Sequence, residues 1–459
     1  MHRYIVLSLG SNSSGQLALG HGEDRHYPEQ TIFGQTSPTT SARLTDTTAC
    51  IALRSRPCVV GGGNHSLMYE PGSDTYYASG SNVHGELGLV PAVGESIVKD
   101  DLALSWQSII ISEFDAGIAK MAAGWYHTLA LDGKGRVYAC GSNEHGQCGI
   151  GERGEATATT GPGRRSHGWI RVEFAGNGDD LVQIADIACG MRHSMAVAKD
   201  GRLYGWGANR HGQLGFKCSG SHSAGAGTVA GKGPEARVKS WSDARKMSVV
   251  WTPTEVPGIS GVTKVACGRH HTACLLNSGE VWVAGDNKYG QQSGPYHKGE
   301  SLRGDNSAVW RRVKLGGPAH SLASGWEHLV ALVRMPPSSG SGPEFTAVVS
   351  WGRSDHGQLG GSLEGLVEDG REDPQVACGS AHTLALTSGG RVVAWGWNEH
   401  GNCGDPSLQN VHSPHEITID GTKVPVESLQ RKRMLLKPVT IGCGYGNSYI
   451  VCELIDVMQ

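Results

Sequence analysis

Two short motifs alternate along this chain, and each of them occurs seven times. The first, called here the Gly-Asn motif, reads G-x-N-x-x-G-Q-x-G or a near relative and begins at Gly10, Gly80, Gly141, Gly207, Gly285, Gly352 and Gly396. The second, the Gly-His motif, reads G-x-x-H before a short alternating run and begins at Gly62, Gly124, Gly190, Gly268, Gly325, Gly379 and Gly444, where the last copy has Asn in place of His. Strict alternation at this period requires a repeat architecture.

Between each Gly-His motif and the next Gly-Asn motif lies a hairpin pattern. Residues 129–141 read LALDGKGRVYACG and residues 384–396 read LALTSGGRVVAWG, so two β-rich runs flank a glycine turn. The chain is rich in glycine (68 residues), which supplies the positive-φ positions that tight turns need. Short antiparallel strands in seven units predict an all-β, seven-bladed β-propeller.

The two ends of the chain predict how the ring closes. Residues 4–9 match the strand that elsewhere follows the hairpin turn, but its upstream partner is missing there. That partner is found at residues 449–454, after Gly444. We therefore expect the last strand to pair with the first.

Four stretches interrupt the repeat within what we interpret as one domain, residues 1–459. They lie near 152–167, 216–250, 335–343 and 405–437, and we expect them to be loop insertions on the faces of the propeller. The last holds a basic triplet at 431–433. Such a triplet is typical of a solvated loop, with contact to RNA or an acidic partner as the alternative.

Charge and cysteine usage restrict the function classes. The net charge is −3, so no global positive field attracts nucleic acid, and direct nucleic-acid binding is not expected. No apolar run is long enough to span a membrane. The 12 cysteines show no zinc-type spacing; Cys189, Cys267, Cys378 and Cys443 each precede a Gly-His glycine, which indicates small buried core residues. We expect no metal, no cofactor and a reducing compartment, the cytosol or the nucleus.

The six motif histidines invite an acid–base or metal interpretation. They are His65, His127, His193, His271, His328 and His382. Each belongs to a different repeat, so we expect them to bind backbone groups across blade junctions instead. No nucleophile elbow, phosphate loop or HExxH motif is present. The sequence therefore predicts no catalytic residues and a chain that is not an enzyme.

The variable positions of the Gly-His motif are better candidates for function. Equivalent loops in every blade lie on one face near the axis, and Trp, Tyr and Arg are enriched at interface centres. They predict a partner-binding patch of Trp125, Tyr126, Arg192, Arg269, His270, Trp326, Glu327 and Tyr445. The alternative is that these side chains only line a central channel.

These motifs resemble the regulator of chromosome condensation repeat over essentially the whole chain. The resemblance implies the propeller fold, which in that family carries exchange factors, photoreceptors, ubiquitin ligase modules and adaptors. The plant ultraviolet-B photoreceptors use Trp and Arg at the same positions in a homodimer face. Here only Trp125 and Trp326 are tryptophans there, three motif copies apart, so we expect no tight tryptophan cluster and no photoreception.

The opening segment, GSNSSGQLALGHGEDRHYPEQT from Gly10, resembles the start of the fungal alpha-tubulin suppressors, also called killer-toxin insensitivity proteins. That resemblance implies a non-catalytic adaptor in a heterodimer with the small zinc- or iron-binding electron carrier of diphthamide synthesis. It also implies a role in Elongator-dependent tRNA wobble-uridine modification. The alternative is a guanine-nucleotide exchange factor for a small GTPase.

Overall fold

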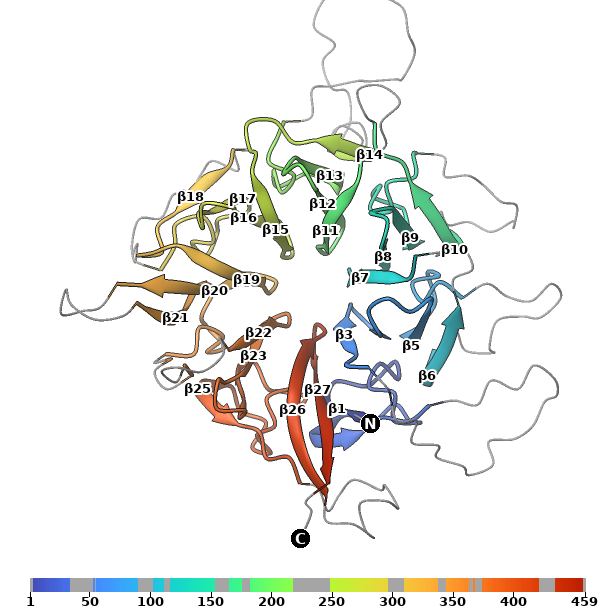
Figure 1. Cartoon of the computed structure of the whole chain (residues 1–459), viewed down its shortest axis with the longest axis vertical. Helices are drawn as coiled ribbons and strands as arrows, with labels where there is room; N and C mark the ends of the chain where they lie inside the picture. The colour runs from blue at the N-terminus through green and yellow to red at the C-terminus, as the bar shows by residue number, and fades with distance from the viewer. Residues whose placement is uncertain are drawn as a thin grey trace, which may run out of the picture.

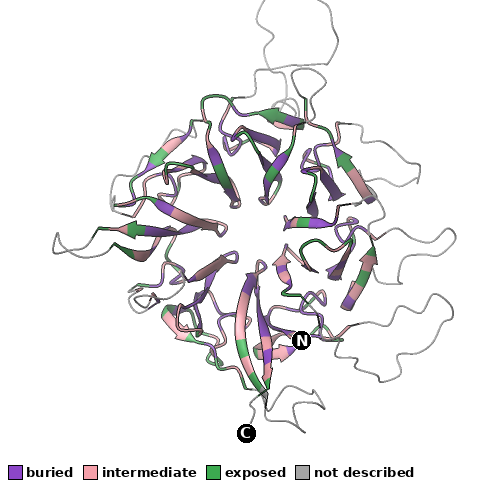
Figure 2. Cartoon of the chain, in the orientation of Figure 1, coloured by how far each residue is buried: buried purple, intermediate pink, exposed green. Residues whose placement is uncertain are grey.

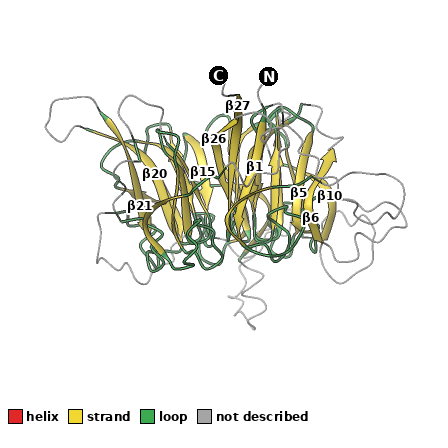
Figure 3. Cartoon of the chain, turned by 90° about the horizontal axis from the view of Figure 1, so that it is seen from below, coloured by secondary structure: helices red, strands yellow, loops and turns green. Residues whose placement is uncertain are grey.

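Seven antiparallel sheets surround a central axis in the computed structural model (Figure 1). The structure describes residues 3–33, 53, 55–89, 102–110, 116–152, 165–175, 182–217, 248–295, 309–336, 344–361, 363, 366–367, 374–420 and 434–456. The predicted seven-bladed, all-β propeller is confirmed. Within the described ranges no helix is long and apolar enough to cross a membrane, and Figure 3 shows only strands and loops.

The blades are numbered in chain order, each from its innermost strand outward. Blades I to III consist of β3 (Cys58–Gly61), β4 (His65–Tyr69), β5 (Thr75–Ser81) and β6 (Leu102–Ile110); β7 (Ile118–Ala123), β8 (His127–Asp132), β9 (Val137–Ser142) and β10 (Arg165–Val172); and β11 (Ile184–Cys189), β12 (His193–Ala198), β13 (Leu203–Ala208) and β14 (Val249–Glu255).

Blades IV to VI consist of β15 (Val262–Cys267), β16 (His271–Leu276), β17 (Val281–Gly285) and β18 (Arg311–Val313); β19 (Ala319–Ser324), β20 (His328–Met335) and β21 (Phe345–Gly352); and β22 (Gln375–Cys378), β23 (His382–Leu386), β24 (Val392–Gly396) and β25 (Val411–Glu416). Blade VII consists of β26 (Met434–Cys443), β27 (Asn447–Asp456), β1 (Tyr4–Gly10) and β2 (Arg25–Gln30). Blade V has three strands among the described residues.

Strand register explains why the two motifs repeat together. In every blade the last residue of the Gly-His motif lies opposite the first glycine of the Gly-Asn motif, as His127 does opposite Gly141. Gly141 has φ of +102°, and a Cβ there would lie 2.4 Å from the carbonyl oxygen of Tyr126 and 2.7 Å from the Cα of His127. Only glycine fits this close approach of two strands.

The expected closure of the ring is confirmed. β1 pairs antiparallel with β27 from Tyr4 opposite Glu453 to Gly10 opposite Asn447. The strand from the start of the chain thus lies inside the last blade, between β27 and β2. Figure 1 shows both termini at this blade.

The hydrophobic core lies between neighbouring blades. One cluster joins Leu129 of β8, Ile187 of β11 and Trp206 of β13, all fully buried. Figure 2 shows buried residues concentrated in the second and third strands of the blades and exposed residues toward the rim. Trp206 also donates its indole N–H to the Gln147 carbonyl of blade II, 2.9 Å away, so packing and hydrogen bonding both hold adjacent sheets together.

The six motif histidines join the blades, as predicted, but their partners differ in part from the prediction. His65 Nε2 lies 3.0 Å from the Thr128 hydroxyl, and Thr128 in turn donates to the Glu86 carbonyl at 2.7 Å. Side-chain hydroxyls therefore contact the Nε2 atoms of these imidazoles, because the residue after each motif histidine is usually Ser or Thr and faces the preceding blade. Equivalent contacts join His127 to Ser194, His193 to Thr272, His328 to Thr383 and His382 to Ser448. The predicted backbone contact across the junction is present for His193 with His271 and for His382 with Asn447.

Two junctions depart from this arrangement. Blade V has Leu329 where the other blades have a hydroxyl residue, and His271 contacts the Ser324 hydroxyl instead, at 3.0 Å. At the closing junction Asn447 replaces histidine and donates to the Tyr449 hydroxyl at 3.0 Å. Tyr449 also bonds the Ser66 hydroxyl of blade I, so the ring is still closed by a polar contact.

The motif cysteines are only partly as predicted. Cys189, Cys267, Cys378 and Cys443 pack against the hydrophobic clusters but are half-buried, because they end the inner strands at the axis. Burial raises the pKa of Cys267 and of Cys378 to about 12. Because the thiolate is the reactive form, these two thiols are expected to be unreactive.

Most residues of the four expected insertions lie outside the described ranges. Residues 153–164, 218–247, 337–343 and 421–433 are not described. The described parts of these stretches also supply strands: β25 and the start of β26 lie within 405–437.

Candidate protein-binding face

The Gly-His loops meet around the axis at one end of the channel. Each loop follows the innermost strand of its blade, and these strands line the axis in Figure 1. Backbone hydrogen bonds link successive loops into a continuous arc. They run from Arg269 N to Trp326 O (2.9 Å), Trp326 N to Ser380 O (2.9 Å), Ser380 N to Tyr445 O (2.9 Å), Tyr445 N to Gly62 O (3.2 Å) and Gly63 N to Gly124 O (3.1 Å). The side chains that they carry therefore stand on a rigid frame.

Three aromatic rings from three blades gather over the axis. Trp125 and Trp326 stack with ring centroids 5.2 Å apart and an angle of 30° between the planes. Tyr445 lies 5.3 Å from Trp125 and 5.2 Å from Trp326. We call Trp125, Trp326 and Tyr445 the axial cluster.

The expectation that no tight tryptophan pair would form was wrong. Blades II and V are three motif copies apart, and in a ring of seven this places them nearly opposite each other. Loops on opposite sides of the axis both point inward, so the long indole side chains of Trp125 and Trp326 meet across it. Distance along the repeat thus does not measure distance at the axis.

Charged side chains border the axial cluster on one side. The guanidinium of Arg269 lies 5.4 Å from the centre of a Trp326 ring, a cation–π distance. Glu327 stands between two arginines, 3.6 Å from Arg269 and 2.7 Å from Arg353. Arg353 also binds Asp355, and this hydrogen bond, followed by that from Glu327, raises the pKa of Arg353. The border is a network of linked ion pairs.

A pocket of about 270 Å³ opens beside the axial cluster. Its wall includes Trp125, Trp326, Tyr445, Trp397, Arg353 and His356. Burial raises the pKa of Tyr445, so its phenol stays neutral. An apolar floor with an arginine at the rim suits a protruding side chain of a protein partner.

The remaining predicted residues lie at the outer part of this face. Tyr126 meets Trp125 edge-on at 5.8 Å and packs against His84 at 4.2 Å. His270 stacks on His211 at 4.1 Å, and burial lowers the pKa of His270 to about 4. Arg192 is exposed. The predicted residues therefore form one central cluster with a charged and polar periphery.

Sequence reasoning missed the contribution of the Gly-Asn motif. In each blade the residue after its first glycine donates its N–H to the carbonyl of the residue before the motif histidine, as Arg353 does to Glu327 at 2.9 Å. This brings Arg353, His356 and Trp397 onto the same face. The signal was available, since these positions vary between copies of an otherwise regular motif.

Comparison with known proteins identifies the family. The RCC1-like domain matches residues 5–450. The chain belongs to this family. It is 29% identical to mouse secretion-regulating guanine nucleotide exchange factor over 98% of this chain and 84% of the relative. It is 28% identical to the ultraviolet-B receptor of Arabidopsis thaliana, over 87% of this chain and 74% of the receptor.

The fold is shared with solved structures of the family. Prp20p from Saccharomyces cerevisiae, whose structure was described with its binding to Gsp1p and histones, superposes with a TM-score of 0.67 at 19% identity. The match covers 100% of this chain and 92% of Prp20p. RCC1-like propellers are largely binding or regulatory proteins, so a binding face is the appropriate kind of site to seek.

Proposed function

We propose that this chain is a guanine-nucleotide exchange factor that binds a small GTPase through the axial cluster and its charged border. The observation that carries the proposal is the half-buried aromatic cluster on a rigid ring of loops. The similarity over 98% of the chain to a mouse protein named as a guanine nucleotide exchange factor supports it.

Exchange requires no chemical step from the propeller. A factor that binds the nucleotide-free GTPase more tightly than the loaded form must, by linkage, weaken nucleotide binding by the same ratio. A preformed surface suits this task, because little loop ordering is needed on binding. Trp125 and Trp326 would supply the buried contact, while Arg269, Glu327 and Arg353 set the orientation.

The test is release of a fluorescent GDP analogue from purified small GTPases of the Ras, Rho, Rab, Arf and Ran classes, mixed with the full chain. We expect one class to release nucleotide faster in proportion to propeller concentration. The double variant Trp125→Ala, Trp326→Ala should slow that release at least tenfold, since truncated hot-spot aromatics typically cost about 2 kcal/mol or more.

A matched control is Ile110→Ala, which removes an apolar side chain that is 69% exposed on the outer strand β6, away from the axis. Its release rate should equal that of the parent. Thermal melting of all variants separates lost binding from lost folding. If the propeller leaves the rate of nucleotide release unchanged for every GTPase class, the proposal is contradicted. If the double variant releases nucleotide as fast as the parent, the binding site does not lie at the axial cluster.

A second proposal is the adaptor role implied by the opening segment, with the zinc- or iron-binding carrier of diphthamide synthesis as partner and Elongator-dependent tRNA modification as the process. The observation behind it is that segment alone. In the structure the segment supports ring closure, because the Asp24 carboxylate contacts both Asn12 N at 2.8 Å and His400 Nδ1 of blade VI at 2.6 Å. A pull-down from cell extract that recovers the carrier, and no GTPase, would favour the adaptor.

We place the chain in the cytosol, with the nucleus as second compartment. The described cysteines are all free thiols, which agrees with a reducing environment. Imaging of the tagged full chain in cells tests this, and a secretory pattern would contradict it.

A further inference from the structure

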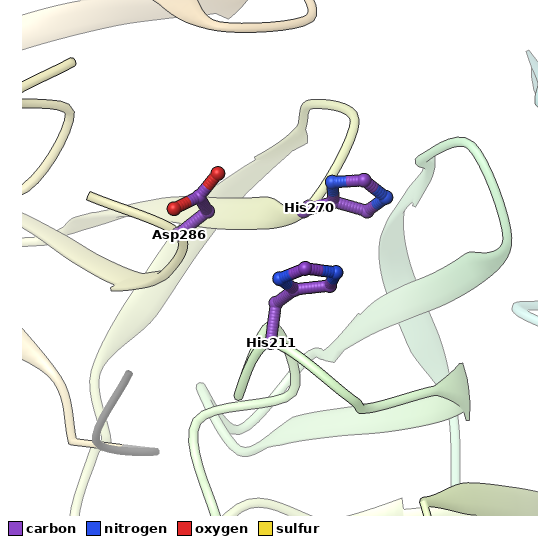
Figure 4. A group of neighbouring side chains, drawn as sticks. All are labelled: His211, His270 and Asp286. Atoms are coloured by element: carbon purple, nitrogen blue, oxygen red, sulfur yellow. The ribbon is translucent and has the colours of Figure 1, made fainter. Parts of the chain in front are cut away.

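Two histidines and an aspartate from blades III and IV face one another at the outer part of the binding face (Figure 4). His211 stands in the Gly-Asn turn after β13, His270 in the Gly-His loop after β15, and Asp286 directly after β17. Their candidate ligand atoms all lie within 4.8 Å of one another. All three residues are half-buried.

The backbone fixes these positions. Asp286 N donates to the carbonyl of His270 at 2.8 Å, so the two side chains leave adjacent points of one blade. His211 is held in its turn by a hydrogen bond from its N–H to Gln213 Oε1 at 2.9 Å. The backbones of two separate blades thus hold the three side chains beside one another.

The combination is specific to one junction of the ring. The equivalent residues at the neighbouring junctions are His84, Tyr126 and Ser142, and His145, Arg192 and Ala208. On the other side they are Tyr289, Glu327 and Arg353. His211 stands at a position that is histidine in five repeats, but in no other repeat are a second histidine and an aspartate found at the two positions beside it.

We infer that His211, His270 and Asp286 form a binding site for a divalent transition-metal ion of the Zn²⁺ class, with a fourth coordination position open toward the binding face. Two imidazoles and one carboxylate form a usual three-ligand zinc set. Zinc ligands about 2.1 Å from the ion lie roughly 3.4 Å apart, so the three groups must close in by about an ångström.

Side-chain rotation can supply that approach. The two imidazoles stack in parallel, 4.1 Å between centroids with 18° between planes, and both must turn about χ2 to point a nitrogen at one ion. Their half-exposed positions leave room for this turn. One Asp286 oxygen accepts the N–H of Lys288 at 3.1 Å, which orients the carboxylate while leaving its second oxygen for the ion.

Nearby positive charge does not fill the site. Arg269 is engaged by Glu327 and Trp326, Arg210 is exposed, and the ammonium of Lys288 lies over the Tyr289 ring at 4.9 Å. The open position faces the same surface as the axial cluster, so a His or carboxylate side chain of a bound protein could complete the coordination.

The test is titration of tag-free, chelator-treated full chain with Zn²⁺ by calorimetry and with Co²⁺ by visible absorption. We expect one ion per chain, with ligand-field bands typical of a four- or five-coordinate Co²⁺ site. His211→Ala and His270→Ala should abolish the binding, and the nearly isosteric Asp286→Asn should weaken it at least tenfold.

The matched control is His84→Ala, which removes the equivalent histidine two junctions away, between blades I and II. This variant should bind the ion as the parent does, and thermal melting confirms that each variant is folded. Absence of stoichiometric binding to the parent chain would overturn the inference. Binding by Asp286→Asn or His270→Ala with the affinity of the parent would overturn it as well, since the ion would then be held elsewhere, for instance by cysteines.

Discussion

Two sets of histidines in this molecule have opposite properties. The six motif histidines are fully buried at the junctions, and each of them contacts a serine or threonine hydroxyl of the next blade. His211 and His270 are half-buried and stack on each other at the face. The position of His211 is histidine in five of the seven repeats, whereas the position of His270 holds another residue type in each of the other six. The fully buried histidines maintain the ring, whereas the histidines at the face are free to serve a site. The predictions below test this division.

The largest expected effect is loss of stability in acid. Burial lowers the pKa of His65, His127 and His328 to about 3, and of His271 and His382 to about 4. These imidazoles stay neutral in the folded state, while the unfolded chain binds protons below its pKa of about 6.5. Stability is therefore complete above pH 6.5 and is lost as the pH falls toward 4.

At pH 5 the loss amounts to about 2 kcal/mol for each such histidine. The five together approach the whole net stability of a typical domain, ~5–15 kcal/mol, and burial lowers the pKa of His193 in the same direction. Urea unfolding midpoints at pH 7.5, 6.5 and 5.5 measure this effect. A midpoint that stays constant over this range would show that the motif histidines are solvated or already charged in the folded protein.

The next largest effect is the difference in the free energy of unfolding between a motif histidine variant and a variant of a histidine at the binding face. His127→Ala removes a buried ring and its contact with the Ser194 hydroxyl, which still donates to the Gln147 carbonyl, so the free energy of unfolding should fall by about 3 kcal/mol. His84→Ala removes a half-buried ring that packs on Tyr126 at the face, at the adjacent junction of blades I and II, and should change it by no more than about 0.5 kcal/mol. Equal losses in the two variants would contradict the division.

A smaller effect tests the hydroxyl partner. Thr128→Val keeps the shape of the side chain but deprives His65 of its hydrogen bond and the Glu86 carbonyl of its donor. A buried imidazole left unpaired should cost about 2 kcal/mol. Thr75→Val on β5, where the hydroxyl bonds only the exposed Asp74 carboxylate, is the control and should have little effect on thermal melting. If Thr128→Val is also neutral, the packing of the ring, not the hydrogen bond, holds that junction.

The smallest expected effect concerns the face. In metal-free buffer, His211→Ala should alter the unfolding free energy by no more than about 0.5 kcal/mol, because the ring is half-exposed and only stacks on His270. The melting temperature measured with chelator present checks this. A loss comparable to that of His127→Ala would mean that His211 belongs to the framework after all.

The sequence allowed the framework to be predicted because its constraints repeat. Seven copies of each motif fixed the number of blades, and the incomplete first and last strands fixed the pairing of β1 with β27. The location of the predicted face followed from the equivalence of the Gly-His loops. Each of these conclusions needed only patterns that recur.

What could not be predicted depends on contacts across the axis and between motifs. The stacking of Trp125 on Trp326 depends on two blades being nearly opposite, which spacing along the chain concealed. The meeting of His270 with Asp286 depends on a backbone hydrogen bond between two different motifs. The serine and threonine partners of the motif histidines were visible in the sequence, but which group they faced was decided by the packing of adjacent sheets.

The pairing of β1 with β27 also sets a timetable for synthesis. Ribosomes extend a chain at about 5–20 residues per second, so the segment from β1 to β27 takes roughly 20 to 90 seconds to make. Blades I to VI can each assemble as they emerge, but β1 must wait for β27, the last of the described strands to be made. During that interval its apolar residues, Ile5, Val6 and Leu7, lack the neighbour that buries them. β1 therefore stays unpaired on that side until β27 emerges, and protection of β1 by chaperones would govern the yield of closed rings.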